Sequence, residues 1–323
     1  MRPFFRRMAV GTLAALGALA AMAAASANDY PSRPVTLVVP YPPGGSTDLI
    51  GRMLAEAIQP HLGQSMVVEN RGGATSAVGT QFVAQAPADG YTVLLAASAF
   101  TVNEAIRDDL QFKTSDFTPV SQLIFMPLTM VVEASYEAQT LEDFIRMAKE
   151  KPGSMSYGSA GIGSSNHLGP EMLAKAAGLD MVHVPYPGIG PAMTDLMGKR
   201  LQMLFGTIPA VKSAIDAGTV RPLAVTSTER AAVLPDVPTM DEAGVPGFGA
   251  ADWIGIFVSA KTDPAIVARL EGAIRAAYAD PAVRKKIEDL GSIPVASTSE
   301  EFKAFIADDI WGRTARELGV KAN

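Results

Sequence analysis

Residues 35–48 read VTLVVPYPPGGSTD, an apolar run followed by a turn rich in proline and glycine. A helical pattern begins at once, because the apolar residues 49, 50, 53, 54, 57 and 58 share one helix face. Glycine lacks a Cβ, so the backbone of such a turn can approach a ligand closely. Ser46, Thr47 or Asp48 can cap the helix, whose first free N–H groups then face the space in front. This pattern is typical of an anion site at a helix N-terminus.

A second turn of the same kind occupies residues 157–167, which read YGSAGIGSSNH. It lies between a predicted strand at 155–158 and a predicted helix at 168–177. A dinucleotide-binding turn is disfavoured, because the glycine order differs and no acidic residue ends the following strand. A plain tight turn is the other interpretation. Because both turns can offer neutral N–H and hydroxyl donors, we predict that they share one carboxylate ligand.

The first 27 residues predict a signal peptide. Arg2, Arg6 and Arg7 precede an uncharged apolar run from 8 to 25, and Ala25-Ser26-Ala27 forms a small-x-small cleavage site. A membrane anchor is the alternative, since the run is just long enough to span a bilayer. General secretion and the twin-arginine route both stay open. We expect cleavage after Ala27 and a soluble protein in the periplasm.

Composition excludes several classes of function. Without residues 1–27 the chain loses three arginines and no acidic residue, so its formal charge changes from −6 to −9. An acidic surface argues against nucleic acid or an anionic membrane as partner. There is no cysteine, which excludes disulfides and thiolate metal sites.

Strand and helix patterns alternate along the remaining chain. Strands are predicted at residues 35–39, 66–68, 91–96, 155–158, 181–184, 201–205 and 220–226. Helices are predicted near 191–197 and 209–217, from Asp263-Pro264 onward, and from Ser299 through Leu318. This alternation predicts an α/β fold with largely parallel sheets, and the length suggests about two domains.

Sequence motifs of catalysis are absent. The chain has no Gly-x-Ser-x-Gly elbow, no His-Glu-x-x-His and no phosphate loop. His61 is predicted to be exposed or C-capping and His183 to be structural, while His167 either contacts the ligand or caps its helix. We expect no enzyme activity, no cofactor and no bound metal. A hydrolase that uses Ser46 or Ser164 is a third interpretation, but neither serine has an evident base.

Several motifs together resemble a known family, and the resemblance covers nearly the whole chain after residue 27. In chain order they are YPSRP (30–34), PPGGSTD (42–48), VVENR (67–71), ADGYT (88–92), YGSAG (157–161), VPY (184–186), LAVT (223–226) and LPDVPT (234–239). This ordered series closely resembles the Bug family (Bordetella uptake gene), the periplasmic solute-binding receptors of tripartite tricarboxylate transporters.

The resemblance implies a two-lobed periplasmic binding protein of type II-like fold, with two Rossmann-like lobes joined by two crossover strands. The first lobe would comprise residues 28–127 and 253–323, and the second residues 128–252. The implied ligand is a small carboxylate, aromatic acids and dicarboxylates included. The implied partners are the membrane subunits of the transporter, with the receptor a monomer. A ligand-sensing subunit of a two-component signalling system is the alternative.

The resemblance also implies which residues bind the ligand. Gly44, Gly45, Ser46 and Thr47 correspond to the first turn of the family. The second turn contributes Ser159, Gly163, Ser164, Asn166 and His167. The remaining expected site residues are Tyr41, Ser98, Tyr186, Gly206 and Thr207.

Two departures from the family pattern bear on the ligand. Many relatives have Phe-Asp-Asn where this chain has Phe205-Gly206-Thr207, and Tyr-Lys-Gly where it has Tyr186-Pro187-Gly188. The first departure predicts a cleft without a carboxylate side chain, and therefore a preference for ligands without an amino group. The second removes a positive charge that would help a highly anionic ligand.

Overall fold

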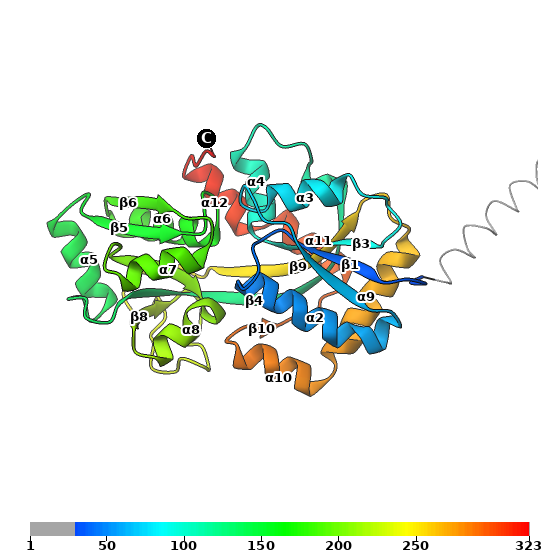
Figure 1. Cartoon of the computed structure of the whole chain (residues 1–323). Coiled ribbons are helices and arrows are strands. Elements are labelled where there is room, and N and C mark those ends of the chain that lie inside the picture. Colours follow the sequence, from blue (N-terminus) through cyan, green and yellow to red (C-terminus); the bar gives the residue numbers. More distant parts are fainter. Residues whose placement is uncertain (1–29, 323) are drawn as a thin grey trace, which may run out of the picture.

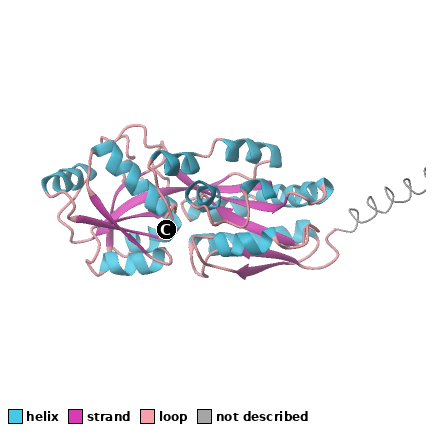
Figure 2. Ribbon diagram, turned by 90° about the horizontal axis from the view of Figure 1, so that it is seen from above, coloured by secondary structure: helices cyan, strands magenta, loops and turns pink. Residues whose placement is uncertain are grey.

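The computed structural model describes residues 30–322, which fold into two lobes lying side by side (Figure 1). In each lobe, helices lie on either side of the strands (Figure 2). The signal peptide predicted for residues 1–27 lies outside the described residues. Between residues 30 and 322, no helix has the length and apolar character needed to cross a membrane.

The first lobe is built around a sheet with the strand order β2-β1-β3-β9-β4, and β10 also pairs with β4. β1 pairs in parallel with β2 and β3, whereas β9 runs antiparallel to β3 and β4. The strands are β1 (Val35–Val39), β2 (Met66–Asn70), β3 (Thr92–Ala97), β4 (Phe117–Glu133), β9 (Ala251–Ser259) and β10 (Ile293–Pro294). The helices are α2 (Ser46–Leu62), α3 (Ala77–Ala84), α4 (Ala99–Ile106), η1 (Thr114–Asp116), α9 (Pro264–Tyr278), α10 (Pro281–Asp289) and α11 (Ser299–Ala307).

The second lobe is built on the far end of β4. There β4 pairs with β7 and β8, and the order continues from β7 through β5 to β6. The strands are β5 (Met155–Ser159), β6 (Met181–Pro185), β7 (Met203–Thr207) and β8 (Val220–Val225). The helices are α5 (Leu141–Glu150), α6 (Ser165–Ala177), α7 (Ile189–Met197) and α8 (Ile208–Asp216). The last helix, α12 (Ile310–Glu317), contacts both α4 and α6.

Strand β4 belongs to both sheets. Its residues 117–127 pair with β9 in the first sheet, and its residues 128–133 pair with β7 and β8 in the second. The chain returns through β9, which pairs with β4 from Ala251 onward. One hydrophobic cluster also runs through both lobes, since it contains Phe100 and Trp253 as well as Tyr157 and Phe205. The lobes therefore share a strand and part of a core.

The predicted α/β character is confirmed, and every predicted strand is present with bounds shifted by a few residues at most. The prediction of largely parallel sheets is wrong, because β4 and β9 run antiparallel to every strand with which they pair. The single helix predicted from Ser299 through Leu318 is wrong, because the chain breaks between α11 and α12. Asp309 ends the interruption as the N-cap of α12 and accepts the N–H of Gly312 at 3.3 Å. Its carboxylate also accepts the indole N–H of Trp253 at 3.1 Å. A tertiary contact thus fixes the break.

Candidate ligand-binding site

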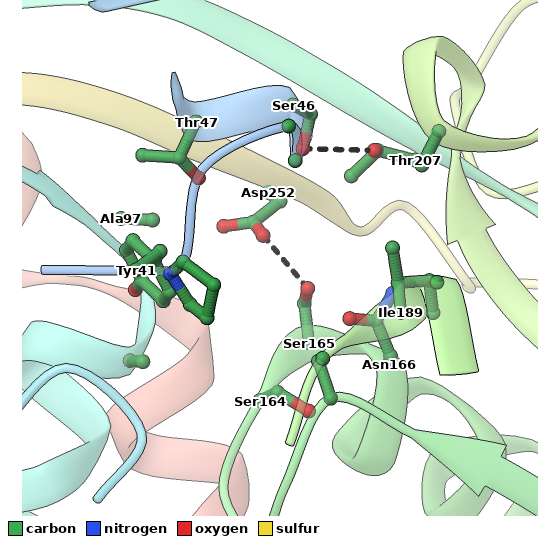
Figure 3. Close-up of a pocket in the computed structure, with 18 of the residues that line it drawn as sticks. Tyr41, Ser46, Thr47, Ala97, Ser164, Ser165, Asn166, Ile189, Thr207 and Asp252 are labelled. Carbon is green, nitrogen blue, oxygen red and sulfur yellow. Dashed lines mark hydrogen bonds between the residues drawn. The ribbon is translucent and has the colours of Figure 1, made fainter. Parts of the chain in front are cut away.

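A cavity of about 520 Å³ lies between the lobes, in front of the first turns of α2 and α6 (Figure 3). Its walls come from loops at the ends of strands in both lobes. The first lobe contributes Tyr41, Pro42, Pro43, Gly44, Gly45, Ser46, Thr47, Leu49, Thr75, Ala97, Ser98, Ala99 and Asp252. The second lobe contributes Ala160, Ser164, Ser165, Asn166, Pro187, Gly188, Ile189, Gly190, Pro191, Thr207, Pro209 and Ala210.

The first helix terminus at the cavity belongs to α2. Its N-cap is Gly45, and no side chain makes a cap hydrogen bond there, so the prediction that Ser46 or Thr47 caps the helix is wrong. The backbone N–H groups of Ser46 and Thr47 make no hydrogen bond to any residue in 30–322. These donors stay available to a ligand at the positive end of the helix dipole.

Asp48 fixes the turn in front of α2 instead of capping the helix itself. Its carboxylate accepts the N–H of Gly44 at 2.9 Å and the amide N–H of Asn70 at 2.9 Å, and it pairs with Arg52 at 3.0 Å. Burial raises the pKa of Asp48, but these hydrogen bonds outweigh burial and hold the pKa below its ordinary value. The charge of Asp48 is therefore already neutralised by partners within its own lobe.

The second helix terminus belongs to α6. Ser164 is the N-cap, and its hydroxyl donates to the carbonyl of Gly161 at 2.8 Å. The backbone N–H groups of Ser165 and Asn166 find no hydrogen-bond partner in the described chain. The Asn166 amide donates to the carbonyl of Phe205 at 2.7 Å, which ties the start of α6 to β7. The second lobe thus presents a helix terminus equivalent to that of the first.

Hydrogen bonds cross the cavity from one lobe to the other. The hydroxyl of Ser165 donates to the Asp252 carboxylate at 2.7 Å, and the hydroxyls of Thr207 and Ser46 lie 3.5 Å apart (Figure 3). Asp252 is the second residue of β9 and is counted here with the first lobe, because it pairs with Met126 in the first sheet. It lies between the starts of α2 and α6. These contacts keep the N-termini of α2 and α6 at the same cavity.

The described lining of the cavity contains an acidic side chain but no basic one. Among the described residues that line it, Asp252 is the one acidic side chain, and none is lysine, arginine or histidine. Burial raises the pKa of Asp252, and hydrogen bonds from Ser165 and Ser98 oppose that shift only in part. Within residues 30–322 there is no group of side chains that could hold a metal ion. Neutral N–H and hydroxyl donors are what this cavity offers an anion.

The structure brings most of the sequence-predicted site residues together. The cavity is lined by nine of them: Tyr41, Gly44, Gly45, Ser46, Thr47, Ser98, Ser164, Asn166 and Thr207. Five lie outside its lining: Ser159, Gly163, His167, Tyr186 and Gly206.

Four of those five residues, Ser159, Gly163, His167 and Tyr186, make hydrogen bonds within the second lobe. The Ser159 hydroxyl accepts the N–H of Gly161 at 3.1 Å and contacts the His183 ring nitrogen at 2.6 Å. The N–H of Gly163 donates to the ring nitrogen of His167 at 3.1 Å. The Tyr186 hydroxyl donates to Asp195. Their polar atoms therefore stabilise the second turn and the loop after β6.

Gly206 contradicts the argument made from its sequence position. A Cβ at this residue would come within 2.2 Å of Val211 on α8, so a side chain here would point into the second lobe. The neighbouring Thr207 lines the cavity instead, as the alternation of a strand requires. The prediction of a cleft without a carboxylate side chain is wrong as well, because Asp252 supplies one.

Sequence reasoning missed Asp252, Ser165 and Thr75. An acidic residue within the otherwise apolar stretch ADWIGIFV was the available signal for Asp252. The signal for Thr75 was a third glycine-rich turn, RGGATS, which also lies between a strand and a helix.

The turn that contains Thr75 has a strained backbone. Ala74, Thr75 and Ser76 have φ values of 46°, 49° and 77°, in the left-handed region that non-glycine residues rarely adopt. The Asn103 amide holds the turn by donating to the Thr75 carbonyl at 2.7 Å and to the Ser76 hydroxyl at 3.2 Å. Strain of this kind collects at functional sites, and here it directs Thr75 into the cavity wall.

Two stacked histidines lie behind the second turn. The rings of His167 and His183 are 4.0 Å apart, and Tyr157 stacks on His183 at 5.0 Å. Burial lowers the pKa of His167 to about 4. Burial lowers the pKa of His183 to about 4, with a smaller contribution from the neighbouring His167. Glu171 opposes this shift. Both rings are neutral near pH 7, which leaves His167 able to accept the Gly163 N–H.

We predict that acid lowers the free energy of unfolding through these histidines. The unfolded chain binds protons at about pH 6.5, whereas the folded chain does so at about pH 4. The contribution of the two histidines to the free energy of unfolding is therefore fully present above pH 6.5, and it is lost as the pH falls from 6.5 to 4. For His167, which is 6% exposed, the loss reaches about 3 kcal/mol at pH 4.

Urea unfolding at several pH values measures this loss. His167→Asn keeps an acceptor for the Gly163 N–H but cannot titrate, so its stability should depend less on pH between 6.5 and 4. His61→Asn, at an exposed position near the end of α2, is the matched control and should follow the unmodified protein. An unchanged pH profile in His167→Asn would contradict the assignment.

Comparison with known proteins identifies the family. The sequence model of the family described as "Tripartite tricarboxylate transporter family receptor" matches residues 50–320 of this chain. The chain belongs to this family. The protein BugT of Bordetella pertussis, strain Tohama I, is 37% identical to this chain over 301 residues. The aligned region covers 92% of this chain and 92% of BugT. The resemblance to Bug receptors drawn from the motifs is confirmed.

Solved structures of this family share the fold. The periplasmic binding protein BugD superposes with a TM-score of 0.84 at 33% identity, covering 91% of this chain and all of that one. Rpa4515 of R. palustris, solved with adipate, superposes with a TM-score of 0.87 at 32% identity, covering 91% and 99%. These family members confirm the two-lobed binding-protein fold.

Proposed function

We propose that this protein is a periplasmic receptor that captures a small carboxylate between its lobes and delivers it to the membrane subunits of a tripartite tricarboxylate transporter. One observation carries the proposal. Two helix N-termini, one from each lobe, present unpaired N–H groups to a cavity whose described lining holds no basic side chain. A carboxylate placed there would receive donors from both lobes and would favour their closed arrangement.

The family supports the wider parts of this proposal. It is described as the receptor of a tripartite transporter, and BugD is a periplasmic binding protein. Adipate in Rpa4515 is a carboxylate of the proposed class. We further propose that the lobes move about two connections, where β4 leaves the first sheet after Pro127 and where the chain enters β9.

The hydrolase interpretation gains no support from the site. The Ser164 hydroxyl donates to a carbonyl, and the Ser46 hydroxyl is near the hydroxyl of Thr207. Neither hydroxyl is hydrogen-bonded to a histidine or carboxylate within residues 30–322. A serine nucleophile needs such a base in reach, so we assign both serines to binding.

A carboxylate is expected to compact the molecule. A thermal-shift screen of mono-, di- and aromatic carboxylates identifies binders, with the corresponding uncharged amides as matched controls. Small-angle scattering should then show a smaller radius of gyration with the acid than with its amide, because the acid contacts both lobes. Tight binding without compaction would contradict closure, and no binding by any carboxylate would contradict the receptor function.

A further inference from the structure

Asp252 is a carboxylate in the wall of a cavity that otherwise suits an anion. It is 8% exposed and lines the cavity at the junction of the lobes. One oxygen accepts the N–H groups of Trp253 at 2.8 Å and Ser98 at 3.3 Å. The other oxygen accepts only the Ser165 hydroxyl, at 2.7 Å, among the described residues.

These contacts leave Asp252 with unused acceptor capacity. An ionised carboxylate has about four acceptor positions, and three donors occupy Asp252 in the structure. The remaining position is on the oxygen that faces Ser165 and the start of α6. A purely structural carboxylate at full burial would be expected to have its lone pairs satisfied by the protein.

The same geometry places Asp252 beside the expected position of the ligand carboxylate. Ser165 is the first residue of α6. Its hydroxyl donates to Asp252, while its backbone N–H has no partner among the described residues and is one of the donors proposed for the ligand carboxylate. Two carboxylates at such short range repel each other. A donor on the ligand, next to its carboxylate, would lie between them and relieve the repulsion.

We propose that Asp252 determines specificity by accepting a hydrogen bond from an ammonium or hydroxyl group adjacent to the carboxylate of the ligand. This inference rests on the proposed function of the same cavity. It makes α-amino and α-hydroxy carboxylates the preferred ligand class, with the ammonium group favoured because it also carries charge. Gly206 points toward Val211 and away from the cavity, so the lack of a carboxylate at this position does not disfavour ligands with an amino group.

Three probes with one four-carbon skeleton test the preference: succinate, racemic malate and racemic aspartate. They differ only in the substituent at carbon 2, which is hydrogen, hydroxyl or ammonium. Calorimetry at neutral pH should show aspartate binding roughly ten- to a hundredfold more tightly than succinate, the range expected for one charge-assisted hydrogen bond, with malate between them. Asp252→Asn should reduce the aspartate preference at least tenfold and strengthen succinate binding.

Ser165→Ala separates specificity from the contact between the lobes. This variant removes the Ser165 hydrogen bond but keeps the Asp252 carboxylate, so it should weaken all three probes by a similar factor and retain their order. The order of the three affinities in the unmodified protein tests the inference without requiring any variant to fold.

Two kinds of result would overturn the inference while leaving the receptor function intact. One is succinate binding as tightly as aspartate, or an unchanged ratio in Asp252→Asn. The other is binding of different carboxylates from the screen with no binding of aspartate or malate. Failure of every carboxylate in the screen would instead overturn the proposed function itself.

Discussion

Gly45→Val is expected to weaken carboxylate binding at least a hundredfold while leaving the fold nearly intact. Gly45 has φ −82° and ψ 171°, an extended conformation open to any residue, and a Cβ there would meet nothing within 4 Å. The added side chain would instead fill the space in front of the unpaired N–H groups of α2. Loss of two hydrogen bonds to a charged oxygen, at about 1.5–3 kcal/mol each, exceeds a hundredfold in affinity.

Calorimetry with the tightest-binding acid of the screen measures the effect, and urea unfolding measures the fold. Valine is a poorer N-cap than glycine, so we expect a stability loss of no more than about 1 kcal/mol. Gly44→Val is the matched control. Its φ of 89° lies in the left-handed region, so it should lose stability as well as binding. Full affinity in Gly45→Val would show that the α2 terminus does not contact the ligand.

Asp309→Ala is expected to lower the free energy of unfolding by about 2–4 kcal/mol. Asp309 is 7% exposed and accepts hydrogen bonds from the Trp253 indole, the Thr101 hydroxyl and the Gly312 N–H. Alanine would leave the Trp253 N–H buried without a partner and would remove the N-cap of α12. Burial raises the pKa of Asp309, so the cost of burying its charge offsets part of the stabilisation that these hydrogen bonds provide.

Urea unfolding compares this variant with Asp308→Ala at the adjacent residue. The Asp308 side chain is 84% exposed, and its ion pair with Arg313 lies at the surface. Such a pair contributes at most about 1 kcal/mol, and the control should remain close to the unmodified protein. Equal, small losses in the two variants would show that the Asp309 contacts do not hold α12 in place.

The sequence by itself predicted seven of the strands and the positions of the glycine-rich turns before α2 and α6, but not the strands β4 and β9 that join the lobes. Alternation of short apolar runs with amphipathic stretches predicted the α/β fold, because these periods reflect burial on one face. Glycine-rich turns before α2 and α6 predicted two ligand-facing helix termini, since that chemistry is local to each turn. Nine of the predicted site residues line one cavity for this reason.

Tertiary structure alone decided what lies between those turns and how the last helices are divided. Asp252 reaches the cavity because β9 pairs beside β4 at the junction of the lobes, far in sequence from both turns. Gly206 points toward α8 because the pleat of β7 sets its direction, whatever its residue type. The break before α12 follows from the contact between Asp309 and Trp253, 56 residues apart. Side-chain direction and long-range pairing depend on packing between distant segments, and local periodicity carries no information about either.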